Sequence, residues 1–143
     1  MKVKLFALVL LMMNSTAFPQ SLEGEWNGYF TSNPYGNKTK IILFFSKIND
    51  STFKGISTTI VLSNNQPDTA ICVLEGGFLK KNILYLEEKR SLKDFTESDP
   101  GPCFQLMKLY YFKRKKKYEL DGEWFSEGKD CDGNGSILLT KSF

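Results

Sequence analysis

The sequence contains no histidine among its 143 residues. This absence excludes Ser-His-Asp and Cys-His catalysis, and it excludes every metal site that needs an imidazole ligand. The sequence also lacks a Gly-x-Ser-x-Gly motif, so it has no nucleophile elbow of the hydrolase type. We therefore expect a protein without catalytic activity and without a cofactor.

The chain has no apolar run long enough to form a permanent transmembrane helix. Its first residues combine the basic Lys2 and Lys4, a short apolar run at 5–13, and the small residues Ser15 and Ala17. This order is typical of a signal peptide, and we place its cleavage after Ala17. We therefore expect a signal peptide at residues 1–17 and a mature domain at 18–143 that is secreted or periplasmic. The alternative is a retained N-terminal anchor helix.

The excess of positive charge is small, with 19 Lys and Arg against 16 Asp and Glu. Removal of Lys2 and Lys4 with the leader leaves 17 basic and 16 acidic residues, a net charge of +1. Composition therefore gives no reason to expect a nucleic-acid partner, and we expect no stable membrane anchor on the mature protein.

Cysteine is scarce, with three residues in the chain. Cys72 lies in an apolar segment and is expected to be a small core residue. Cys103 and Cys131 adjoin clusters of Gly, Pro and Asp at predicted strand ends, where the geometry of a disulfide is easier to satisfy. Because export exposes thiols to an oxidising compartment, we expect Cys103 to pair with Cys131.

One short segment occurs twice, as Leu-Glu-Gly-Glu-Trp at 22–26 and as Leu-Asp-Gly-Glu-Trp at 120–124. In both copies Leu, Gly and Trp alternate with the acids, which is the period of a strand with one buried face. The acids should then point to solvent, so they would not converge in a cleft as the carboxylate pair of a glycosidase does.

The remaining chain contains short segments of strand character separated by turn signals, and no convincing helical stripe. This pattern predicts an all-β fold, a single antiparallel up-and-down meander of about eight strands that closes into a small barrel. Closure removes the exposed sheet edges that favour aggregation. The expected strands are residues 23–32, 38–48, 52–63, 69–79, 83–88, 103–112, 116–126 and 135–142.

The opening of the mature chain resembles two known families. Gly24-Glu25-Trp26 resembles the first strand of the lipocalins, and Leu22-x-Gly24-x-Trp26 followed by Phe53-x-Gly55 resembles the first strands of avidin-like barrels. Both families are calycin-type barrels, so the resemblance implies a cup that holds a ligand, with Gly24 and Trp26 as the barrel-closing pair. The chain has no Thr-Asp-Tyr motif and no later row of tryptophans, and the resemblance therefore transfers no ligand contacts.

The predicted inward set is Trp26, Phe30, Tyr118 and Trp124, and these are the candidates to line a site for a small apolar or amphipathic ligand. The alternative is that they form ordinary core, because a small eight-stranded barrel can fill its interior with side chains. In that case the protein is a structural or interaction module of the cell envelope. Its contact surface would be the loop at 91–102 or the basic tip at Lys113–Lys117.

The basic tip follows several aromatic residues, an arrangement that also occurs in binding patches for nucleic acids. In an exported protein we favour a charged hairpin tip that keeps an edge soluble. Contact with anionic lipid or polysaccharide is the alternative.

The segment around Asp130, Asp132 and Asn134 matches the first ligand positions of a calcium loop. The position of the bidentate glutamate is occupied by Lys141, however, and Asp-Gly and Asn-Gly are equally typical of hairpin turns. We therefore expect a turn here and no bound metal.

Overall fold

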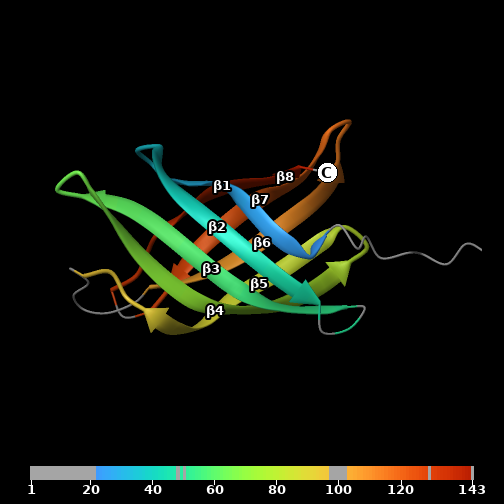
Figure 1. Cartoon of the computed structure of the whole chain (residues 1–143), viewed down its shortest axis with the longest axis horizontal. Coiled ribbons are helices and arrows are strands. Elements are labelled where there is room, and N and C mark those ends of the chain that lie inside the picture. The colour runs from blue at the N-terminus through green and yellow to red at the C-terminus, as the bar shows by residue number, and fades with distance from the viewer. Residues whose placement is uncertain (1–21, 48, 50, 97–102, 129, 143) are drawn as a thin grey trace, which may run out of the picture.

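The computed structural model describes residues 22–47, 49, 51–96, 103–128 and 130–142. In this part of the chain each strand pairs antiparallel with its neighbour in sequence, and β1 also pairs with β8. The sheet is thus a closed up-and-down barrel (Figure 1), which confirms the predicted meander. Its strands are β1 (Gly24–Ser32), β2 (Asn37–Lys47), β3 (Thr52–Ser63), β4 (Gln66–Lys80), β5 (Ile83–Lys93), β6 (Phe104–Lys113), β7 (Lys117–Glu127) and β8 (Asn134–Ser142).

The predicted signal peptide at residues 1–17 lies outside the described residues and stays a prediction. Half of the loop expected at 91–102, namely residues 97–102, also lies outside the described residues. Within the described part of the chain, no helix is long and apolar enough to cross a membrane.

The alternation predicted for the repeated segment is confirmed in both copies. Leu22, Trp26 and Leu120 are 0% exposed and Trp124 is 4% exposed, so both indole rings lie inside the barrel. The acids between these positions are exposed on the outer surface, as predicted: Glu23, Glu25, Asp121 and Glu123.

Two strands extend further than the sequence indicated. We expected residues 64–67 to separate β3 from β4, but the turn uses Asn64 and Asn65, whose φ angles are 51° and 62°, and β4 begins at Gln66. Asparagine adopts this left-handed region more readily than most residues, so two residues suffice for the turn. Strand β5 continues to Lys93, because register shifts in its pairing with β4 let the ladder run past the predicted end at Glu88.

Gly55 lies within β3, and a glycine inside a strand commonly marks a bulge or a sharp bend. The pairing of β3 with β2 and β4 is continuous at Gly55, so there is no bulge at this residue. A Cβ added there would lie 2.0 Å from the carbonyl oxygen of Phe44, and the glycine therefore permits a close approach of two backbones.

The end of the barrel that contains the β2–β3, β4–β5 and β6–β7 turns is filled by large side chains. Trp26 donates its indole N–H to the carbonyl oxygen of Leu22 at 3.0 Å, and its ring forms a T-shaped contact with the Tyr111 ring at a centroid distance of 6.5 Å. Phe53 contacts both Phe45 and Phe78, with ring centroids 6.3 and 5.5 Å apart. Side chains thus close this end of the barrel.

Candidate functional site

The opposite end of the barrel contains a cavity of about 240 Å³. Its lining comes from the last residues of β1 and β3, the first residues of β2 and β4, and the region where β5 and β6 separate. In Figure 1 this end is marked by the β3–β4 turn, in green, and the filled end by the β6–β7 turn, in orange. The lining residues are Phe30, Thr39, Thr59, Val61, Ala70, Cys72, Glu88, Asp94, Phe95, Cys103 and Gln105.

The cavity exists because inward side chains become smaller toward this end. On β2 the inward series runs from Phe45 at the filled end to Thr39 at the cavity. On β4 it runs from the buried Leu74 to Cys72 and Ala70. Threonine and alanine do not reach the barrel axis, so a space remains where leucine and phenylalanine would fill it.

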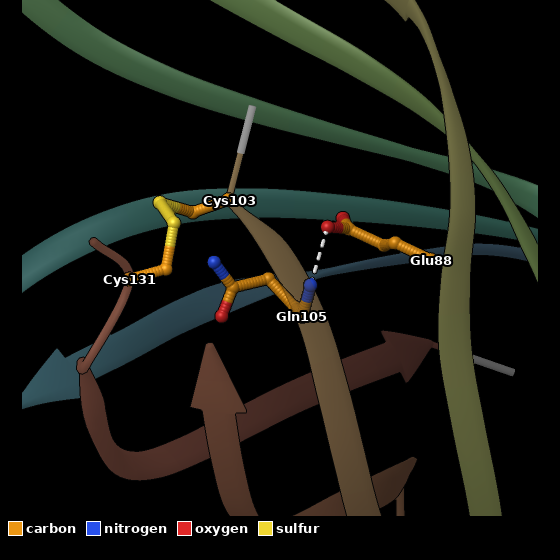
Figure 2. Close-up of a disulfide and its surroundings, with 4 residues drawn as sticks. All are labelled: Glu88, Cys103, Gln105 and Cys131. Carbon is orange, nitrogen blue, oxygen red and sulfur yellow. Dashed lines mark hydrogen bonds between the residues drawn. A yellow bond between two sulfur atoms is a disulfide. The ribbon is translucent and has the colours of Figure 1, made fainter. Parts of the chain in front are cut away.

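Glu88 is the buried charged group of the cavity wall, with 5% of its surface exposed. Its carboxylate accepts a hydrogen bond from the Ser57 hydroxyl and another, at 2.8 Å, from the backbone N–H of Gln105 (Figure 2). Burial raises the pKa of Glu88 above its usual range, although both hydrogen bonds act in the opposite direction. The raised pKa means that burial makes the ionised form of Glu88 costly. A positively charged group nearby would lower this cost.

Gln105 contributes a second acceptor. Figure 2 shows its side chain extending away from Glu88, toward the Cys103–Cys131 disulfide. Its amide oxygen is buried and has no hydrogen-bond partner among the described residues. Because buried acceptors in proteins are nearly always paired, this unpaired oxygen is an unusual feature beside the cavity.

Cys72 is a buried free cysteine, in agreement with its predicted place in the core. Burial raises the pKa of its thiol to about 12, and the negative charges of Glu88 and Asp94 contribute to this shift. Since the thiolate is the nucleophilic form, Cys72 is unreactive at neutral pH. The carboxyl groups of Glu88 and Asp94 thus lie close enough to the Cys72 thiol to act on it.

The predicted disulfide is confirmed. Cys103 and Cys131 are bonded, with their Cα atoms 5.7 Å apart. The bond joins the residue before β6 to the connection between β7 and β8, and Cys103 also lines the cavity. The disulfide therefore holds two segments together at the rim of the cavity.

The four aromatic residues predicted to line a ligand site lie at different depths. Phe30 lines the cavity, and Trp124 packs against it with ring centroids 4.8 Å apart. Trp26 and Tyr118 both contact Tyr111 in the filled part of the barrel, Tyr118 by stacking at 5.8 Å. The cavity lining thus contains one of the four, and a binding role for the set stays a prediction.

The sequence did not lead us to predict Glu88 or Gln105 as site residues, although both line the cavity. A signal for Glu88 was present, because it has the same parity as Leu84 and Leu86, which are buried in β5. An acid at an inward position of a strand is unusual and can mark a functional site.

The residues of the calcium-loop pattern do not come together as a metal site. The side-chain oxygen of Asn134 accepts a hydrogen bond of 3.1 Å from the Asn33 amide, and Asn134 begins β8. Among the described residues, no group of three or more His, Cys, Asp and Glu side chains is placed to hold a metal ion.

The basic tip at Lys113–Lys117 forms the predicted β6–β7 hairpin, at the end of the barrel opposite the cavity. Its five residues are exposed. Arg114 and Lys117 each form an ion pair of 3.0 Å with Glu119, while Lys115 and Lys116 extend the charged surface. Any contact that uses this tip is therefore remote from the cavity.

Comparison with known proteins identifies the fold. No family model and no curated protein matches the sequence. A solved structure of EF1p2_mFAP2b bound to DFHBI is 9% identical, covers 88% of this chain and 97% of its own, and has a TM-score of 0.60. The redesigned β-barrel mFAP1 bound to DFHBI is 12% identical, with 85% and 96% covered and a TM-score of 0.59. A further redesigned β-barrel is 14% identical, with 85% and 92% covered and a TM-score of 0.56. At these identities the likeness concerns the closed eight-stranded barrel alone.

Proposed function

We propose that this protein is an exported, non-enzymatic β-barrel that binds a small amphipathic molecule in the cavity at its open end. The observation that carries the proposal is the cavity of about 240 Å³, which is lined by apolar and hydroxyl side chains together with the buried carboxylate of Glu88 and the side chain of Gln105. Ligand sites in proteins have this composition, with a mostly apolar wall and a few polar groups that orient the ligand.

The volume limits the size of the ligand. Typical pockets for drug-sized compounds measure about 300–1,000 Å³, so this cavity suits a molecule built on a single aromatic ring or a short alkyl chain. A longer ligand would extend past Asp94 and Phe95, which lie just after the end of β5. Two of the similar barrels are described as bound to DFHBI, which supports ligand binding by a barrel of this fold.

A disulfide at the rim of the cavity supports export. The Cys103–Cys131 disulfide is compatible with an oxidising compartment, because structural disulfides are rare in the reducing cytosol. The proposed signal peptide at 1–17 would deliver the chain to such a compartment.

Native mass spectrometry of protein purified from its own host tests the proposal directly. We expect a retained small molecule that is released on unfolding, and a clean apo mass under several purification conditions would count against binding. The variant Ala70→Phe places a large ring in the cavity, whereas Ile71→Phe adds the ring on the other face of the same strand. Binding should disappear in the first variant and persist in the second, while both keep the β-sheet circular dichroism signal.

The alternative function, an interaction module of the cell envelope, is favoured by the exposed tip at Lys113–Lys117. Protein without a retained molecule, together with binding to anionic vesicles that depends on the tip, would support this alternative.

A further inference from the structure

The cavity wall is acidic. Two of its lining residues, Glu88 and Asp94, carry carboxyl groups, and no Lys or Arg occurs among the described residues that line it. The other polar lining residues are neutral, namely Thr39, Thr59 and Gln105. A ligand therefore meets two carboxyl groups and no Lys or Arg among the described residues that line the cavity.

Three cations lie near Glu88 along the chain, and none of them lines the cavity: Arg90 is exposed, while Lys89 and Lys93 have partners outside it. Lys93 donates to the Thr69 hydroxyl at 2.6 Å, and Thr69 is not a lining residue. Lys89 forms an ion pair of 2.6 Å with Glu87. These side chains therefore do not neutralise Glu88 from within the cavity.

Glu88 is held by neutral donors, the Ser57 hydroxyl and the Gln105 backbone N–H. A buried carboxylate without a cation is costly, since the hydrogen bonds replace only part of its hydration. Its raised pKa is a consequence of this burial, and the raised pKa of Cys72 indicates that both carboxyl groups act on the same region. A cation bound in the cavity would relieve this electrostatic cost.

We propose that the ligand of the cavity is an amphipathic amine, with its ammonium group beside Glu88 and its apolar part against Phe30, Val61 and Phe95. An ammonium group has several N–H donors and no acceptor, so it can donate to the Glu88 carboxylate without placing a second acceptor beside it. This inference rests on the proposed function, because it names the chemical class of the molecule that the barrel binds.

If Glu88 serves only to join β5 to β6, and does not bind the ligand, its replacement should have a different effect. The bond from Gln105 to Glu88 joins β6 to β5 just beyond the last paired residues, Glu87 and Leu106. If Glu88 only joins these strands, its replacement changes stability but leaves the preference among ligand head groups unchanged. Head-group preference is therefore the readout that separates the two roles.

Binding of an amine should depend on pH in a defined direction. The ammonium group favours the ionised form of Glu88, so affinity should rise as pH increases through the raised pKa of this residue, and binding should release a proton. The other titratable groups that face this region are Asp94 and Cys72, and Cys72, with a pKa of about 12, stays protonated throughout.

The experiment uses three probes with the same apolar body, namely phenethylamine, phenethyl alcohol and phenylacetate. Their affinities are measured by isothermal titration calorimetry at neutral pH. For the wild-type protein we expect phenethylamine to bind about tenfold more tightly than the alcohol, a difference of about 1.4 kcal/mol, and phenylacetate to bind most weakly. In Glu88→Gln the preference for the amine should disappear while the affinity for the alcohol persists.

Asp94→Asn provides the second variant. Asp94 is exposed, so this change leaves the buried network in place and should reduce the affinity for the amine by less than Glu88→Gln does. Thermal melting of each variant verifies that it is folded.

The outcomes separate the amine preference from ligand binding itself. Equal affinity of the wild-type protein for amine and alcohol would overturn the amine inference and leave ligand binding intact. An amine preference that survives in Glu88→Gln would also overturn it, because the head group would then be recognised elsewhere. Failure of all three probes to bind would count against the proposed function together with this inference.

Discussion

The backbone N–H of Gln105 donates a hydrogen bond of 2.8 Å to the carboxylate of Glu88 at the point where β5 and β6 separate. The pairing of these strands ends at Glu87 and Leu106, so the carboxylate provides an acceptor that the backbone ladder no longer offers. Glu88 thus accepts a hydrogen bond where the pairing of β5 with β6 ends, and the same carboxyl group lines the cavity.

Stability should fall as pH rises through the range in which Glu88 ionises. Its pKa in the folded protein is raised above the ordinary value of 4.5, so between these two values the folded state holds a proton that the unfolded state has lost. The stabilisation is complete below the unfolded-state pKa and is lost as pH passes the folded-state pKa. Urea unfolding at a series of pH values measures this, with Glu88→Gln as the reference that should lack this component. Identical pH profiles for the two proteins would contradict the prediction.

Removal of the disulfide should destabilise the protein by roughly 3.5 kcal/mol in the loop-entropy model, because the bond closes a segment with a sequence separation of 28. Cys103→Ser combined with Cys131→Ser tests this by urea unfolding, and Cys72→Ser is the control for loss of a thiol outside the bond. We also expect weaker probe binding in the double variant, because Cys103 lines the cavity. A non-reducing peptide map that finds Cys72 in the bond would contradict the pairing.

Gly122→Ala should destabilise the barrel by about 3 kcal/mol or more, a large overpacking effect. The added Cβ would lie 2.0 Å from the carbonyl oxygen of Lys108 in the neighbouring strand, and backbone cannot move aside as a flexible side chain can. Gly36→Asn is the control, since a Cβ there meets nothing within 4 Å and asparagine tolerates its φ of 71°. Chemical denaturation of both variants measures the difference, and equal midpoints would show that the strands adjust freely.

Charge reversal at the basic tip should leave both stability and cavity binding unchanged. Lys115 and Lys116 are exposed and lie at the end of the barrel opposite the cavity, so Lys115→Glu with Lys116→Glu should change stability by about 0.5 kcal/mol or less. Calorimetry with phenethylamine and thermal melting measure the two quantities. The same variant tests the envelope alternative, because sedimentation with anionic vesicles should weaken if the tip is a contact surface. A large loss of probe binding would show that the two ends of the barrel are coupled.

Much of the fold was predictable because strand periodicity is local. Alternation around Trp26 and Trp124 indicated which side chains face inward, and turn residues indicated where most strands end. The pairing of Cys103 with Cys131 was also predictable, since both adjoin strand ends in a chain expected to be exported.

The site was less predictable, because periodicity gives the face of a residue and not its depth along the barrel axis. Trp26 and Phe30 share a face of β1, yet one lies in the filled end and the other lines the cavity. Depth depends on how far each strand is shifted against its neighbours, and the shifts between β4 and β5 arise from long-range pairing.

The sequence by itself determined the alternation of inward and outward side chains, the approximate strand limits and the absence of histidine chemistry. The tertiary structure alone decided that Glu88, Gln105 and Cys72 meet around one space. The reason is that these residues come from three different strands, and only the closed pairing of the whole sheet brings them to the same depth.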